Sequence, residues 1–164
     1  MDTILATIVE EFSDLGSARE ITQLIVRLFV AAAMGAVLGL ERERQGKPAG
    51  IRTHMLVAAS SALIVLVAVQ SGMDDEALSR VLQGLLAGVG FVCAGAILKL
   101  EQEEKVHGLT TAAGVWMTAA IGITAGLGRE MTAFLSTLIV LGIFWMEGPL
   151  QRLGFSKPQG GTDD

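Results

Sequence analysis

Five long apolar runs constrain this chain more than any other feature of its sequence. They cover about residues 24–40, 55–69, 81–98, 109–127 and 131–146, with few charges inside them. A helix needs about 20 mostly apolar residues to cross about 30 Å of hydrocarbon, and it pairs its own backbone amides in lipid. Only 18% of the 164 residues are charged, against about 25% in soluble domains. The sequence therefore predicts an all-α, polytopic membrane bundle of about five transmembrane helices.

Lysine and arginine residues divide unequally between the two sets of segments that connect these runs. One set carries eight of them: Arg42, Arg44, Lys47, Arg52, Lys99, Lys105, Arg152 and Lys157. The opposite set carries only Arg19, Arg80 and Arg129. Because cytoplasmic loops are enriched in these residues, we predict a multi-pass inner-membrane protein with a periplasmic N-terminus and a cytoplasmic C-terminus.

The chain divides into three regions. Residues 1–20 have apolar side chains at helical spacing, namely Ile4, Leu5, Ile8, Val9, Phe12 and Leu15. This pattern indicates either an amphipathic helix on the outer membrane surface or a disordered tail. Residues 21–150 form the transmembrane domain, and residues 151–164 are expected to be a cytoplasmic tail.

An internal repeat links the two basic turns. A shift of 58 residues aligns residues 36–53 with residues 94–111 without a gap, and five positions are identical: Ala36/Ala94, Glu43/Glu101, Lys47/Lys105, Gly50/Gly108 and Thr53/Thr111. Both copies cross the membrane in the same direction, so the pattern favours a parallel two-span repeat. Coincidence between two hairpins rich in small residues is the alternative.

The first basic turn, residues 41–53, is the densest polar feature. We expect Thr53 to cap the second span, and the second copy, with Gly108, Thr110 and Thr111, to cap the fourth. Two helix N-termini near Arg42, Arg44 and Arg52 would then favour an anion. The alternative is ordinary anchoring at the membrane surface with Glu–Arg pairs.

Magnesium would require oxygen ligands, and one or two carboxylates suffice because the ion keeps several waters. Five glutamates on the cytoplasmic side are candidates: Glu41, Glu43, Glu101, Glu103 and Glu104. Within the spans the sole acid is Glu147, at a span's end, which argues against a simple cation carrier formed by one chain. His54 and His107 lack partners at ligand spacing, and no catalytic or nucleic-acid-binding motif is present. We therefore expect no enzyme, no cofactor and no nucleic-acid partner.

Arg27 is the one charge at membrane depth, roughly one turn from the outer surface. An intramembrane charge is costly and indicates function by default, although an arginine near the edge can extend its guanidinium outward. Gln83 lies at a similar depth in the third span and is the expected partner of Arg27.

Glycines at helical spacing predict close helix packing or self-association. They are Gly35 and Gly39 in the first span, Gly84, Gly88, Gly90 and Gly95 in the third, and Gly114, Gly122 and Gly126 in the fourth. We expect a homo-oligomer.

Four motifs occur in order: Gly39-Leu40-Glu41-Arg42-Glu43, Ala49-Gly50-Ile51-Arg52-Thr53, Gly88-Val89-Gly90-Phe91, and Gly108-Leu109-Thr110-Thr111 through Trp116. Over about residues 27–128 the chain resembles the bacterial MgtC/SapB family of inner-membrane proteins. The resemblance implies about five spans and a role in adaptation to low magnesium. By position it singles out Arg27, Glu41, Arg42, Gly50, Arg52, Thr53, Gly90, Gly108, Thr111 and Trp116.

The chain departs from the family pattern in three places. Cys93 stands where glycine is common, and Thr110 stands where some virulence members have asparagine. We also expect no soluble C-terminal regulatory domain, since the sequence stops at Asp164. The resemblance implies two alternatives: a transporter or transport accessory linked to magnesium homeostasis, and a non-transporting regulator of another membrane complex such as the ATP synthase.

Overall fold

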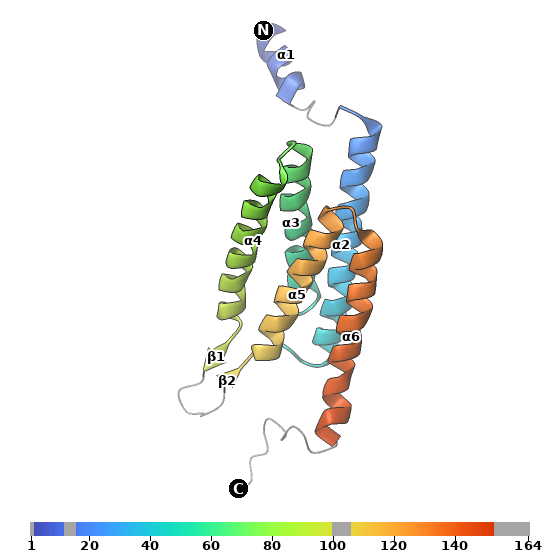
Figure 1. The fold of residues 1–164 in the computed structure, drawn as a ribbon, viewed down its shortest axis with the longest axis vertical. Coiled ribbons are helices and arrows are strands. Elements are labelled where there is room, and N and C mark those ends of the chain that lie inside the picture. The colour runs from blue at the N-terminus through green and yellow to red at the C-terminus, as the bar shows by residue number, and fades with distance from the viewer. Residues whose placement is uncertain (1, 12–15, 100–105, 153–164) are drawn as a thin grey trace.

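The computed structural model describes residues 2–11, 16–99 and 106–152. Its helices are α1 (Asp2–Glu11), α2 (Ala18–Arg44), α3 (Ile51–Gln70), α4 (Asp75–Gly95), α5 (Leu109–Gly126) and α6 (Glu130–Arg152). Two short strands, β1 (Leu98–Lys99) and β2 (Val106–His107), pair in antiparallel fashion between α4 and α5. Figure 1 shows α2 to α6 side by side, with α1 beyond the end of the bundle at which α2 begins.

The predicted all-α membrane bundle is confirmed. In the described residues, α2, α3, α4 and α5 are each long and apolar enough to cross a membrane, and the apolar part of α6, Glu130–Met146, is shorter. The C-terminal ends of α2, α4 and α6 lie at one end of the bundle, as the alternating topology requires (Figure 1). Which end faces the cytoplasm stays a prediction.

Two of the predicted span boundaries are wrong. α2 continues through Arg44, so residues 41–44 are helical rather than part of a turn, and only residues 45–50 connect α2 to α3. α4 ends at Gly95 instead of residue 98, and the chain then enters β1. The charged side chains at 41–44 follow the helix because Glu and Arg are good helix formers beside an end that water can reach.

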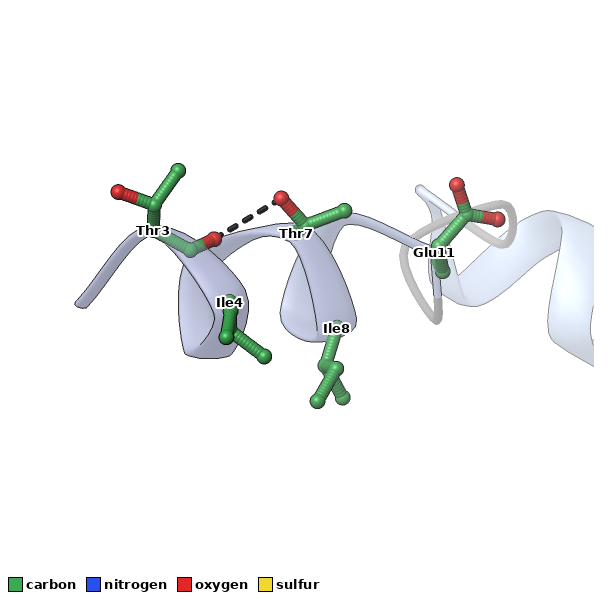
Figure 2. Close-up of a pocket in the computed structure, with 5 residues that line it drawn as sticks. All are labelled: Thr3, Ile4, Thr7, Ile8 and Glu11. Atoms are coloured by element: carbon green, nitrogen blue, oxygen red, sulfur yellow. Dashed lines mark hydrogen bonds between the residues drawn. The ribbon is translucent and has the colours of Figure 1, made fainter. Parts of the chain in front are cut away.

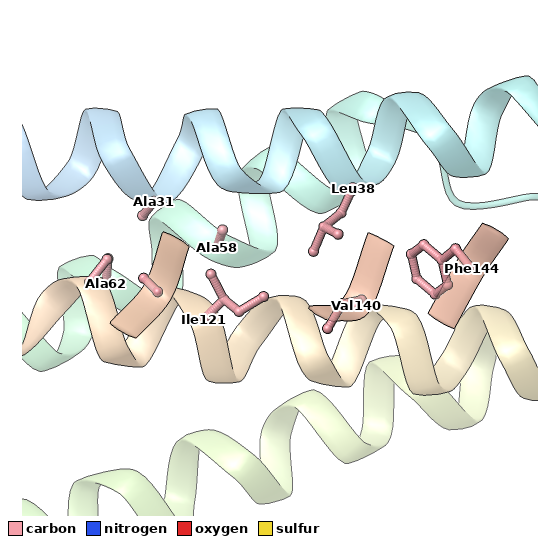
Figure 3. Close-up of a cluster of buried hydrophobic side chains, with 9 residues drawn as sticks. Ala31, Leu38, Ala58, Ala62, Ile121, Val140 and Phe144 are labelled. Carbon is pink, nitrogen blue, oxygen red and sulfur yellow. The ribbon is translucent and has the colours of Figure 1, made fainter. Parts of the chain in front are cut away.

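The core lies where α2, α3, α5 and α6 meet, and small side chains dominate it. Ala31, Ala58, Ala62, Ala125 and Ala133 are fully buried, with Leu38, Ile121, Val140 and Phe144 filling the space between them (Figure 3). Because lipid is as apolar as the core, such helices associate through close packing rather than through the hydrophobic effect.

Glycines set the closest approaches of this core. A Cβ at Gly35 would lie 2.5 Å from the His54 carbonyl oxygen, and a Cβ at Gly39 would lie 2.6 Å from the Ile51 Cα. On α5, a Cβ at Gly126 would lie 2.6 Å from the Ala62 carbonyl oxygen, and one at Gly122 would overlap the carbonyl of Ala58. α3 is therefore held between α2 and α5 by direct backbone contact, as the glycine pattern predicts for the first and fourth spans.

The structure repeats the same contacts at the 58-residue spacing. Gly50 and Gly108 are the N-cap residues of α3 and α5. Gly35 faces the carbonyl of His54, and the equivalent Cys93 donates its Sγ–H to the carbonyl of the equivalent Ala112 at 3.2 Å. The sequence repeat is thus a repeat of helix register and not a coincidence of composition.

The N-terminal residues form a helix that stands apart from the core. Ile4, Leu5, Ile8 and Val9 are all exposed, and Thr7 donates to the backbone carbonyl of Thr3 within α1 at 2.9 Å. Figure 2 shows Ile4 and Ile8 on one side of α1, where they line a shallow hollow of about 300 Å³ with Thr3, Thr7 and Glu11. Phe12 and Leu15 lie outside the described residues, and the position of α1 on a membrane surface stays a prediction.

Candidate functional site

The α2–α3 turn carries a carboxylate cap. Glu43 extends from the last turn of α2 and accepts the backbone N–H of Ile51 at 3.1 Å, and its Oε2 lies 2.6 Å from the position that a Cβ at Gly50 would take. A carboxylate at a helix N-terminus is favoured by the helix dipole. The prediction that Thr53 caps this helix is therefore wrong: the N-cap is Gly50, and Thr53 is an exposed residue of the first turn.

The N-terminus of α5 is built differently. Its N-cap, Gly108, has φ of +90°, a conformation that favours glycine, and a Cβ there would overlap the Ala96 carbonyl. Thr111 is buried and Thr110 is exposed, and neither side chain caps the helix, against the prediction. The predicted anion cradle also fails at α3, because Glu43 already occupies that N-terminus.

Arg42 is the centre of a buried polar network. Its guanidinium is fully buried, lies 4.6 Å from the centroid of the Phe144 ring, and donates to Gln45 Oε1 at 2.9 Å. Gln45 in turn donates to Glu41 Oε1 at 2.9 Å and to the Phe144 carbonyl at 3.3 Å. The network ties the end of α2 to α6, and Glu41 belongs to it.

A second buried polar pair reaches deeper into the bundle. His54, fully buried in the first turn of α3, forms a hydrogen bond through Nδ1 to Thr118 Oγ1 at 2.7 Å. Thr118 lies midway along α5 and also donates to the carbonyl of Gly114. Sequence reasoning missed this pair, as well as Gln45 and Phe144. Thr118 is visible as a polar residue in an apolar run and His54 as a neighbour of the basic turn, but nothing in the sequence links the two.

Arg27 is placed at the opposite end of the bundle. Its Nη1 donates to the carbonyl of Gly126 at 3.0 Å, and its Nε lies 3.9 Å from Glu130 Oε1. The predicted pairing with Gln83 is wrong, because Gln83 is exposed and donates to Ser79 on its own helix. The C-terminal carbonyls of α5 offer Arg27 a nearer acceptor, and the contact closes the α5–α6 turn.

The glycines of α4 are placed unlike those of α2 and α5. At Gly84, Gly88, Gly90 and Gly95, a Cβ would meet no atom of another helix within 4 Å. Phe91 is 82% exposed and Trp116 is 42% exposed, so both large rings face away from the core. The close packing predicted for these glycines is thus absent within the described part of the chain, which leaves self-association or a partner.

The predicted cation ligands do not converge. Among the described residues, no group of three or more His, Cys, Asp or Glu side chains is placed to hold a metal ion. Glu41 and Glu43 take part in separate contacts, and Arg52 is exposed on α3. Glu101, Glu103 and Glu104 lie outside the described residues.

Comparison with known proteins decides the family. The MgtC family profile matches residues 28–153, which is most of the chain. The chain belongs to the MgtC family.

Relatives within the family have different lengths. SrpB of Synechococcus elongatus is 46% identical over 72% of this chain and 71% of its own length. YhiD of Escherichia coli K12, whose name assigns it provisionally to magnesium transport, is 41% identical over 74% of this chain and 60% of its own length. MgtC of Salmonella typhimurium is 36% identical over 71% of this chain and 49% of its own length. No solved structure matches the chain.

Proposed function

We propose that this membrane protein acts in magnesium homeostasis as a transporter or a transport accessory of the bacterial inner membrane, working as an oligomer. The name of YhiD supports the link to magnesium. The observation that carries the transport role is the buried polar series formed by Arg42, His54 and Thr118. Transport paths need polar groups near the bilayer midplane, and Thr118 supplies one at mid-helix depth.

This assignment explains why the polar groups are buried rather than simply anchored at the surface. A surface anchor would leave Arg42 in the headgroup region, whereas its guanidinium is fully buried on the Phe144 ring. Burying such a group is costly without compensating contacts, so its retention favours a functional role. The same cluster offers no cage of carboxylates, which fits a permeation or coupling role better than tight magnesium chelation.

The test is flux into proteoliposomes that contain the purified chain and a magnesium-sensitive dye inside. We expect magnesium entry to depend on Thr118, so that Thr118→Val lowers the rate while Ser60→Ala, at the equivalent repeat position, does not. Absence of magnesium movement by the wild-type chain, with or without co-reconstituted membrane proteins, contradicts the proposal.

A second candidate is a non-transporting regulator that binds another membrane complex, such as the ATP synthase. The exposed face of α4 with Gly90 and Phe91 favours it, because small residues beside a large ring suit helix–helix docking. Under this alternative, Gly90→Leu abolishes capture of the partner complex and Thr118→Val leaves capture intact. The transport proposal instead predicts that Thr118→Val lowers the magnesium flux and that Gly90→Leu leaves the flux unchanged.

A further inference from the structure

A narrow groove runs between α3 and α4. It has a volume of about 420 Å³ and is lined on the α3 side by Val57, Ser60, Ser61 and Ile64, and on the α4 side by Arg80, Val81, Gly84, Leu85, Gly88, Val89 and Val92. Gly84 and Gly88 form part of its wall, and the space beside both is open. α4 lies at the edge of the bundle (Figure 1), and little of its apolar span is buried, so this side of the bundle faces the bilayer.

The groove is apolar in effect despite its two serines. Ser60 Oγ donates to the carbonyl of Leu56 at 2.7 Å, and Ser61 Oγ donates to the carbonyl of Val57 at 2.7 Å. Both hydroxyl groups thus donate within α3, so neither needs a hydrogen-bond acceptor from a molecule in the groove. An occupant along its length must be hydrocarbon.

The dimensions of the groove select a chain rather than a helix. Its α4 wall runs from Arg80 to Val92, about 18 Å at a rise of about 1.5 Å per residue. Even the full empty space between the two walls, about 840 Å³, gives a mean section of only about 47 Å² over that length. A helix at least 10 Å across has a section of about 80 Å². Only a group as thin as an acyl chain, with neighbours at about 4 Å, fits inside.

Charges lie at one end of the groove. Arg80 lines it and is paired with Glu76 at 2.6 Å, one turn closer to the start of α4. Asp74, whose side chain caps the helix, and Asp75 precede Glu76 in the first turn, so the start of α4 carries three carboxylates and the one guanidinium that Glu76 contacts. A guanidinium has five N–H donors, which leaves donors for a phosphate, while the carboxylates repel a headgroup of net negative charge.

We propose that the α3–α4 groove is a binding site for a zwitterionic phospholipid with a primary ammonium. One acyl chain lies along Gly84 and Gly88, the phosphate accepts hydrogen bonds from Arg80, and the ammonium donates to the carboxylates of Glu76 and Asp75. The proposal is independent of the transport and regulator roles, because it concerns a site on the lipid-facing side of the bundle.

The test uses purified, delipidated protein in detergent, titrated with phosphatidylethanolamine or phosphatidylglycerol of the same acyl composition. Native mass spectrometry counts bound lipid. We expect the wild-type chain to bind phosphatidylethanolamine about tenfold more tightly, the factor that one charge-assisted contact supplies. Gly88→Leu fills the groove and should weaken binding of both lipids, and Arg80→Gln should lower affinity about tenfold.

Two matched variants separate this site from general effects. Gly90→Leu adds the same side chain to α4 in open space outside the groove, and Arg19→Gln removes an exposed charge from α2 at the same end of the bundle. Both should bind phosphatidylethanolamine like the wild-type chain. Equal affinity for the two lipids, unchanged binding by Gly88→Leu, or a dimer that Gly88→Leu dissociates without any lipid bound would each overturn the proposal.

Discussion

The two repeated hairpins differ in how closely their helices approach. In the first, Gly35 and Gly39 bring the backbones of α2 and α3 into contact. In the second, the equivalent residues are Cys93 and Ile97, and a thiol occupies the position of the direct backbone contact. α3 and α5 are consequently buried at the centre, whereas most of α4 is exposed.

This difference shows that the two copies of the 58-residue repeat can keep the same helix register and still differ in how closely their helices pack. The register of the repeat is kept, since Gly50 and Gly108 both cap their helices, but side chains at the crossing point set the separation of the helices. The first hairpin forms the packed core with α5 and α6. In the second hairpin, α4 instead presents its glycines, one wall of the groove and the exposed ring of Phe91 to the bilayer.

The largest expected effect comes from adding one methyl group to the first hairpin. In Gly35→Ala the new Cβ lies 2.5 Å from the His54 carbonyl oxygen, so the two backbones must move apart. Overpacking of this kind should destabilise the protein by about 3 kcal/mol. Thermal unfolding in detergent micelles measures the loss. Gly84→Ala is the control, with no loss expected, because its Cβ enters open space; equal loss in both variants would contradict the contrast.

Removal of the buried charge should come next. Arg42→Met keeps an apolar stem against Phe144 but loses the hydrogen bond to Gln45 and the contact of the guanidinium with the ring. We expect destabilisation of about 2 kcal/mol in the same unfolding measurement. Arg44→Met changes an exposed neighbour and should cost little. If Arg44→Met costs as much, then general surface charge and not the network explains the effect.

The polar pair at mid-depth gives a smaller effect. Thr118→Val removes the hydroxyl that bonds His54, and a buried hydrogen bond contributes about 1 kcal/mol. Ser60 is the equivalent residue of the first hairpin and bonds only its own helix, so Ser60→Ala should leave the unfolding temperature nearly unchanged. Equal shifts for the two variants would show that the hydroxyls have the same role in both hairpins.

The smallest effect is expected at the crossing point of the second hairpin. Cys93→Ala keeps the Cβ and loses the weak Sγ–H bond to Ala112 with the packing of one buried sulfur atom, at a cost of about 0.5 kcal/mol. Gly35→Ala and Cys93→Ala both place alanine at equivalent positions of the repeat. The ratio of their changes in unfolding free energy therefore measures how differently the two hairpins are packed. A cost at Cys93 that matches the one at Gly35 would mean that the hairpins are packed alike.

Most of the fold could be predicted from apolar run length, since the bilayer fixes how long a spanning helix must be. The repeat could also be predicted, because Gly50 and Gly108 keep their place. The caps could not: Thr53 was expected at α3, but Glu43 reaches back from α2, and only the turn geometry shows that. The partner of Arg27 was missed for a similar reason, since backbone carbonyls of α5 leave no trace in side-chain patterns.

The His54–Thr118 pair marks the limit of the sequence for the site. Each residue alone has an ordinary explanation, and their 64-residue separation gives no hint of contact. Only the approach of α3 to α5, which Gly122 and Gly126 permit, brings them within hydrogen-bond distance. Close packing at small residues therefore brings the polar residues together. The glycines could be identified from the sequence, but the contact between His54 and Thr118 that they permit could not.

We expect both hairpins to cross the membrane in the same direction, with the basic turns on the cytoplasmic side. Single cysteines at Pro48 and Met73, in a Cys93→Ser background, test it with a membrane-impermeant maleimide on intact cells. We expect labelling at position 73 before permeabilisation and at position 48 only afterwards. Labelling of both positions from the same side, or of position 48 in intact cells, would contradict the account.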